Sequence, residues 1–336
     1  MLCDSIIEWS LNHKNILPKE IFNAYSILGE KLKNAQRFVL NRDAVMTINS
    51  IAESTPKRFE QALSVCRLPY PSLWIEFSFK DRLDWMTEAV NRGLVIEKHE
   101  DSSPPSRLGL YIEQINKNEI MIIPCWSHPN FNLVSICHMA LRINIDPNDD
   151  VSIPPDLRQE IIQKINNLGS KSSLLNKWMN NKEEIEYGYK LESRISEYIP
   201  YFMRPIWDAI PAGSNYDKLL DLSRYDLKSE WRFALSFLTV INSRNVISIG
   251  PETDMVKLNK SRLKKNITPL MSYREIRLNI SKIQRNRLGE AYSSRDLQAH
   301  LVRGHWKLRK SGLFWWNPFV RGSIGEASST TTIIKG

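Results

Sequence analysis

Two histidines near the end of the chain are the clearest candidates for chemistry. His300 and His305 stand in the stretch HLVRGHWKLRK, and a pair of imidazoles can act as acid and base in metal-free RNA cleavage. Arg303 or Lys307 would then stabilise the pentavalent phosphate. On an alternating strand, however, positions 300 and 305 face opposite sides. The pair is therefore a weak candidate for catalysis, and the same segment also suits binding.

Basic and aromatic residues alternate through this segment and just beyond it. Cationic side chains meet phosphates, and indole rings offer a stacking surface to unpaired bases or to an apolar peptide. We predict RNA or ribosome contacts at Arg303, His305, Lys307, Arg309, Lys310 and Arg321, and aromatic contacts at Trp306, Trp315 and Trp316. The alternative is a terminal hairpin whose tryptophans complete the core and whose charges protect a sheet edge.

Charge is distributed unevenly along the chain. Residues 255–321 hold sixteen Lys and Arg against three acidic residues, whereas the rest holds 30 basic and 34 acidic residues. A concentrated positive charge indicates a polyanionic partner, and the usual one is nucleic acid. A merely solvated, solubilising face is the competing interpretation.

Other candidate sites are less specific. Trp74 and Glu76 in the strand-like LWIEF are weak candidates for peptide contacts. A CxxH and a CH dipeptide allow a zinc site, but their surroundings resemble buried strands, so we expect no metal; these residues are Cys125, His128, Cys137 and His138. The acidic DPNDD loop at 146–150 lacks the glycine and distal glutamate of a calcium loop. Glu183, Glu184 and Glu186 fit an exposed helix face.

Familiar cofactor motifs do not occur in the chain. Neither a Walker loop, a Rossmann glycine fingerprint, HExxH nor GxSxG is present, which disfavours most cofactor enzymes. We therefore expect no cofactor. The longest nearly apolar run, Trp231 to Ile241, is too short for a membrane span, and the first residues lack a secretory signal pattern. A cytoplasmic setting in a bacterial host cell is expected.

The helices and strands that the sequence predicts around these residues indicate an α+β fold. Residues 1–66 show helical spacing, and residues 67–150 combine strands with one helix at 81–92, which predicts an antiparallel sheet with a packed helix. The strands are expected at 73–79, 94–97, 108–115, 120–126 and 133–143, with a hairpin turn at 116–118. Residues 151–255 are mainly helical, with helices at 156–168, 174–194 and 217–241.

The last part of the chain completes the predicted organisation. Residues 256–322 form the basic region, which ends in a hairpin of strands 300–309 and 313–320 around Ser311 and Gly312. Residues 323–336 are a tail.

Three segments resemble a known family. RGHW at 303–306 with the following LFWWNPFVRG is similar to the C-terminal signature of the type V-A anti-CRISPR family of phage and plasmid proteins. LPYPSLWIEF at 68–77 resembles its proline-plus-aromatic strand, and FALSFLTVINSRNV at 233–246 resembles its apolar helix with a short linker. The likeness is distributed over much of residues 68–322.

The resemblance implies a binding protein with no catalytic role of its own. It implies recognition of a nascent polypeptide, the N-terminus of a type V-A CRISPR effector or another target, followed by decay of the messenger RNA by host nucleases. A surface on the sheet domain would bind the peptide, and the basic surface of this protein would contact the ribosome or RNA. The alternatives are a metal-independent ribonuclease, an RNA-binding protein acting through the basic hairpin, and a DNA-binding protein.

Overall fold

The computed structural model describes most of the chain. It covers residues 1–52, 56–91, 104–128, 133–146, 148–149, 182–210, 216–227, 230–243 and 247–278, and four short strands between 300 and 321. The α+β class predicted from the sequence is confirmed.

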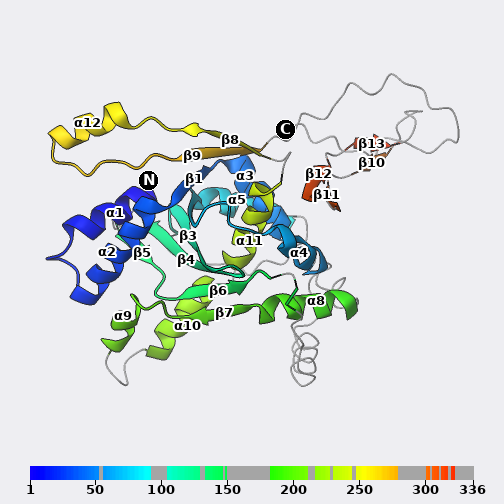
Figure 1. Ribbon diagram of the computed structural model, residues 1–336, viewed down its shortest axis with the longest axis horizontal. Coiled ribbons are helices and arrows are strands. Elements are labelled where there is room, and N and C mark those ends of the chain that lie inside the picture. Colours follow the sequence, from blue (N-terminus) through cyan, green and yellow to red (C-terminus); the bar gives the residue numbers. More distant parts are fainter. Residues whose placement is uncertain are drawn as a thin grey trace, which may run out of the picture.

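A nine-stranded mixed sheet forms the centre of the molecule (Figure 1). Its order is β7-β6-β4-β3-β2-β1-β9-β8, and β5 pairs with β4 beside β6. The strands are β1 (Gln36–Leu40), β2 (Ser72–Ser78), β3 (Arg107–Asn116), β4 (Glu119–His128), β5 (Leu133–Ile136), β6 (Ala140–Asn144), β7 (Ile195–Tyr198), β8 (Ile247–Glu252) and β9 (Arg274–Leu278).

Helices cover both faces of this sheet. One face packs against α1 (Leu2–Asn12), α2 (Lys19–Asn34) and α9 (Arg204–Asp208). The other packs against α3 (Arg42–Ala52), α4 (Pro56–Ala62), a 3-10 helix (Leu63–Val65), α8 (Lys182–Ser193), α10 (Tyr216–Leu227) and α11 (Glu230–Ile241). The helix α5 (Phe79–Asn91) follows β2 and contacts α3.

Strand β2 shows why two helical layers are needed. Leu73, Ile75 and Phe77 belong to the core under α3 and α11, whereas Trp74 belongs to the core under α1 and α2. Side chains of a strand alternate between faces, so a strand covered on both sides must be apolar at nearly every position. Glu76 is the exception, and its burial is complete.

The sheet differs from the predicted antiparallel one at its centre. Strand β1 lies parallel to both β2 and β9, and it falls within the region predicted to be helical throughout. The short run QRFVL between two helices does not distinguish a buried strand from a helical turn by periodicity alone. The sheet also takes strands from the first four of the five predicted parts of the chain, because β7 and β8 come from 151–255 and β9 from 256–322.

Several predicted boundaries also change. The single strand expected at 133–143 is two strands, β5 and β6, separated at Cys137, whose N–H donates to the Pro124 carbonyl at 2.9 Å. The helix expected at 217–241 is two helices, α10 and α11. The strand expected at 94–97 and the helix at 156–168 lie outside the described residues.

None of the helices in the described part of the chain combines the length and apolarity that a membrane crossing requires.

A long excursion leaves the sheet between β8 and β9 and carries the helix α12 (Val256–Lys264) at its far end. Residues 253–272, here called the arm, run past the sheet edge and over α1 (Figure 1). The Met271 N–H donates to the Asp4 carboxylate of α1 at 2.7 Å. The Ser272 carbonyl accepts from Arg37 Nε of β1 at 2.7 Å, so the arm is attached to both a helix and a strand at its base.

Candidate nucleic-acid interface

The predicted hairpin is present as two successive strand pairs. β10 (His300–Val302) pairs with β13 (Phe319–Arg321), and β11 (His305–Arg309) pairs with β12 (Gly312–Trp316). Gly312 lies opposite Arg309 and so begins the return strand, one residue earlier than predicted. His300 and His305 belong to different strand pairs, which gives no support to a joint catalytic role.

The cationic and aromatic candidates take defined places in this ladder. Lys307 lies opposite Phe314, and Trp306 lies opposite Trp315. His305 pairs with Trp316, and Arg321 pairs with His300. Arg303 and Lys310 lie outside the described residues, as do the side-chain positions of the whole hairpin.

Trp74 and Glu76 do not form a peptide-binding surface, which corrects the prediction. Their exposed fractions are 1% and 0%. The Glu76 carboxylate accepts the N–H groups of Leu2 and Cys3 at 2.8 and 3.2 Å, and the Trp74 Nε1–H at 3.1 Å. Arg107 of β3 also donates to it. A carboxylate at a helix N-terminus satisfies otherwise unpaired N–H groups, so Glu76 holds α1 on the sheet.

The buried cysteines are poor candidates for reaction or metal binding. Burial raises the pKa of the Cys66 thiol to about 12 and raises those of Cys3 and Cys125 well above the ordinary value, and only a thiolate is nucleophilic. Cys125 and Cys137 pack in different hydrophobic clusters. Among the described residues, no three His, Cys, Asp or Glu side chains gather as a metal site would require.

The arm is the described part of the basic region, and its helix is built from local signals. Asp254 Oδ1 accepts the Val256 N–H at 2.9 Å at the start of α12. At the other end Asn266 has a φ of 54°. The Asn266 N–H reaches the Leu263 carbonyl at 3.1 Å and the Ile267 N–H reaches the Arg262 carbonyl at 3.0 Å. This is the Schellman pattern that ends a helix and reverses the chain.

One side of α12 is bound to the returning chain. Asn259 donates from Nδ2 to the Leu270 carbonyl at 2.8 Å and accepts the Leu270 N–H at 2.7 Å. Arg262 Nε donates to the Thr268 carbonyl at 2.8 Å. Because no residue of α12 is buried, these side-chain bonds, and not a hydrophobic core, hold the helix in place.

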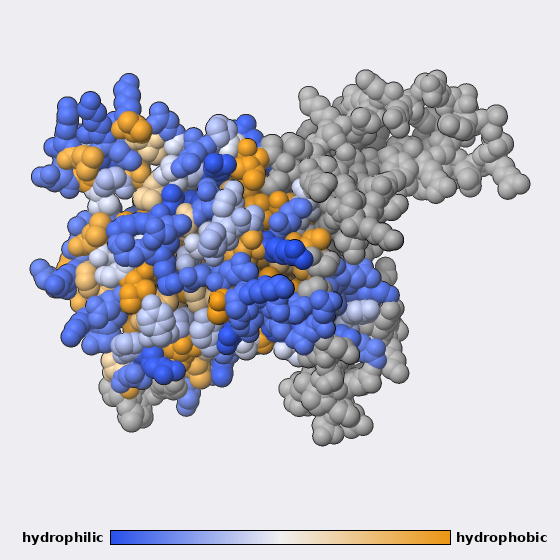
Figure 2. Space-filling model, in the orientation of Figure 1, coloured by the Kyte–Doolittle hydropathy of each residue, from blue (hydrophilic) through white to orange (hydrophobic). Residues whose placement is uncertain are grey.

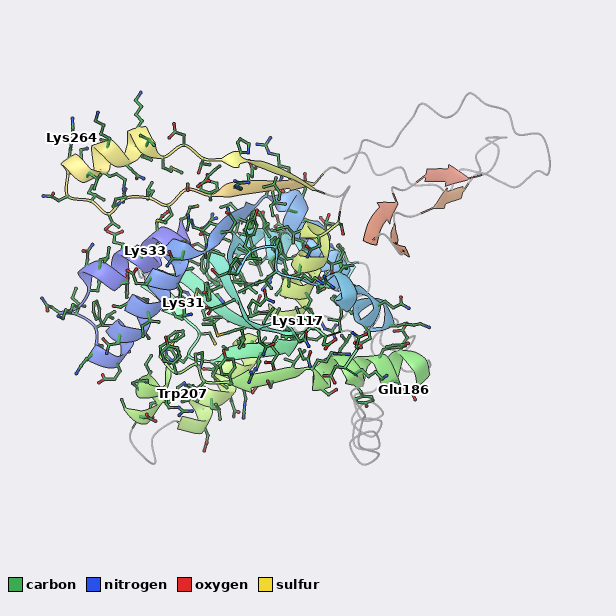
Figure 3. All side chains as sticks on the ribbon, in the orientation of Figure 1. Lys31, Lys33, Lys117, Glu186, Trp207 and Lys264 are labelled. Atoms are coloured by element: carbon green, nitrogen blue, oxygen red, sulfur yellow. The ribbon has the colours of Figure 1, made fainter. Side chains whose placement is uncertain are left out.

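The opposite side of α12 presents three lysines. Each helical residue turns by about 100°, so Lys257, Lys260 and Lys264 fall within an arc of about 60° that lies nearly opposite Asn259 and Arg262. We call these three residues the lysine row. Among the described residues, no carboxylate lies within ion-pair distance of the row. In the structure Lys264 lies at the far end of the arm, and Lys31 and Lys33 lie on α2 (Figure 3).

Aliphatic side chains lie beside the lysine row. Val256 is 75% exposed and Leu263 is 58% exposed. The space-filling view shows the arm as a projecting, mostly hydrophilic lobe with separate hydrophobic spots (Figure 2). The positive charge of this lobe comes from the row together with Arg262 and Lys265, so its outer surface suits a polyanion.

The basic region is predicted from the sequence, but the helix α12 within it is not. The spacing of the row, at i, i+3 and i+7, is the signal that would have shown one cationic helical face. Asp254 before it and Asn266 after it are residue types that begin and end helices.

Comparison with known proteins adds no relative. No protein-family model matches the chain, and no curated protein or solved structure matches it.

Proposed function

We propose that this protein is an RNA-contacting regulator that acts on its target during translation. The observation that carries the proposal is the lysine row, which lies on the side of α12 opposite the returning chain and has no carboxylate partner among the described residues. A row of unneutralised cations attracts a polyanion, and each phosphate contact releases counterions and adds salt-sensitive affinity.

The target is proposed from the family resemblance. The protein recognises the nascent N-terminus of a type V-A CRISPR effector, or of another polypeptide, and promotes decay of its messenger RNA by host nucleases. The RGHW, LPYPSLWIEF and FALSFLTVINSRNV segments support this assignment.

Sedimentation with ribosomes tests the basic contact. The arm variant Lys257→Ala/Lys260→Ala/Lys264→Ala is compared with a control that removes three exposed lysines elsewhere, Lys19→Ala/Lys117→Ala/Lys218→Ala. We expect the wild type and the control to sediment with ribosomes in low salt, and the arm variant to be released. Equal sedimentation of all three proteins contradicts the assigned role of the arm.

The hairpin is tested separately with Arg303→Ala/Lys307→Ala/Arg309→Ala. We expect this variant also to lose ribosome or RNA association while its far-ultraviolet circular dichroism stays the same. Unchanged association would remove the hairpin from the proposed surface and leave the arm as the contact.

Reporter messages separate peptide recognition from RNA recognition. One message keeps the N-terminal peptide of a candidate target under synonymous recoding, and the other keeps most nucleotides under a compensated frameshift. We expect message loss to follow the peptide. Loss that follows the nucleotides, or cleavage of naked RNA that disappears in His305→Ala, would favour an RNA reader or a ribonuclease instead.

A further inference from the structure

The geometry points to double-stranded RNA, held by its phosphates and without regard to sequence, as the ligand of the arm. This inference rests on the proposed function and narrows it. It follows from what the side chains of α12 are able to recognise and from how firmly they are held.

The asparagine and the arginine within α12 are turned toward the returning chain. Asparagine reads adenine edges, and arginine or lysine reads guanine edges, in the major groove of DNA, whereas the deep, narrow major groove of duplex RNA is closed to side chains. Asn259 uses its amide on both backbone groups of Leu270, and Arg262 binds the Thr268 carbonyl through Nε. Phosphate contacts fix position but carry no sequence information, and lysines are what the outer face offers.

The arm also lacks the groups that hold unpaired bases. Single-stranded nucleic acid is bound by stacking bases on aromatic rings along a cationic groove. Residues 253–272 contain no aromatic residue, and the exposed neighbours of the row, Val256 and Leu263, are aliphatic. Stacking is therefore left to other parts of the chain, and the arm is restricted to the backbone of its ligand.

The row has a regular spacing along one helix, which favours a ligand whose charges are regularly spaced. Lys257 and Lys264 are separated by about 10 Å along the helix axis at 1.5 Å per residue. The Schellman ending and the Asn259 bridge keep this row in one orientation relative to the base of the arm. A duplex presents phosphates at regular positions, and proteins recognise duplex RNA mainly by its shape and backbone.

The test measures binding of the full-length protein by fluorescence anisotropy. The probes are two 20-base-pair RNA duplexes of unrelated sequence and one single strand of equal length. Wild type is compared with the Lys257→Ala/Lys260→Ala/Lys264→Ala variant and the Lys19→Ala/Lys117→Ala/Lys218→Ala control. Alanine favours helix, so we expect α12 to be retained in the arm variant. Hydrogen exchange of the α12 amides checks this.

We expect wild type to bind both duplexes within about twofold of each other, since phosphate contacts are independent of sequence. The arm variant should bind duplexes about 10- to 100-fold more weakly near 0.1 M salt, with a slope of log K against log salt shallower by about 2 to 3. Its affinity for the single strand should fall by less than about threefold, and the control should behave as wild type.

Two outcomes would overturn the inference and leave the proposed function standing. In one, the single strand loses as much affinity as the duplexes in the arm variant. In the other, wild type prefers one duplex sequence strongly over the other. Failure of wild type to bind any of the RNA probes would count against the inference and the proposed function together.

Discussion

The Glu76 carboxylate, buried in the middle of β2, accepts the backbone N–H of Leu2 at 2.8 Å, although the two residues are 74 positions apart. The same carboxylate accepts the N–H of Cys3, the indole N–H of Trp74 and the guanidinium of Arg107. Every partner is a donor. One side chain thus accepts hydrogen bonds from the start of α1, from a tryptophan on its own strand and from a cation of β3.

Glu76→Gln is expected to destabilise the protein strongly. The glutamine amide puts an NH₂ group where only donors point, so buried N–H groups lose their acceptor. We expect the free energy of unfolding, measured with urea, to fall by about 2–4 kcal/mol. Glu113→Gln is the control, because Glu113 pairs with Lys31 at the partly exposed surface, and such a pair contributes about 1 kcal/mol or less.

Equal losses of unfolding free energy in Glu76→Gln and Glu113→Gln would show that Glu76 does not hold α1 on the sheet. A second readout follows the helix itself. In Glu76→Gln the amides of α1 should lose hydrogen-exchange protection before those of β3, because the substitution removes the connection between α1 and the sheet.

Gly109→Ala tests the packing around the same carboxylate. Gly109 lies opposite Glu76 in the β2–β3 ladder, and a Cβ built there would lie 2.2 Å from the Trp74 ring. That ring is buried and is held by its hydrogen bond to Glu76. We expect the free energy of unfolding to fall by about 1–3 kcal/mol, as it does in other overpacked cores.

The double-mutant cycle decides whether this clash is the cause. Trp74→Leu removes the ring, so adding Gly109→Ala to it should cost much less than adding it to the wild type. If the cost is the same in both backgrounds, the backbone of Gly109 and not the indole ring would be responsible.

The local parts of the fold could be predicted from the sequence, and the long-range parts could not. The β3–β4 hairpin follows from alternating residues around Asn116 to Asn118, which are neighbours in the chain. The pairing of Phe38 with Arg274 joins distant segments, and no local pattern specifies it. The sequence shows Glu76 as an acid in an apolar strand, but its partners include α1 and β3, and only the folded chain brings them together.

The candidate interface shows the same limit. Charge counting identified the region from residue 255 onwards, because composition does not depend on folding. Which cations face outward depends on Asn259 and Arg262, whose bonds to Leu270 and Thr268 orient the helix. These contacts are formed across the chain reversal at Asn266, and the lysine spacing alone does not show them.

Stability should fall in mild acid through His138. Burial lowers the pKa of this imidazole in the folded protein, while the unfolded chain has the ordinary value of about 6.5. The unfolded state therefore takes up a proton first. The contribution to stability is complete above about pH 6.5 and is lost as the pH falls below it, by less than about 1.4 kcal/mol per pH unit.

Urea unfolding at pH 7.5 and 5.5 measures this loss. We expect wild type to lose more stability between the two pH values than His138→Gln does, because the variant has no imidazole to protonate. His128→Gln serves as the control and should follow wild type. If His138→Gln loses as much as wild type, other groups account for the acid sensitivity.

Asn259→Ala should release α12 without unfolding the body. A nine-residue helix with no buried residue is only marginally stable alone, and Asn259 provides two bonds to the returning chain. Alanine has a higher helix propensity than asparagine, so propensity would predict a firmer helix. We expect the opposite: at least about tenfold less hydrogen-exchange protection in residues 256–264, since losing one or two hydrogen bonds costs about 1–3 kcal/mol.

The control for this effect is Ser261→Ala, an exposed position on the same helix, which should keep or increase protection because alanine favours helix there too. The global free energy of unfolding should change little in either variant, because α12 buries no residue. Duplex RNA affinity should fall in Asn259→Ala although every lysine is present, because a mobile helix no longer holds the lysine row at one spacing. Unchanged duplex affinity together with lost protection would mean that the charge of the arm matters and its orientation does not.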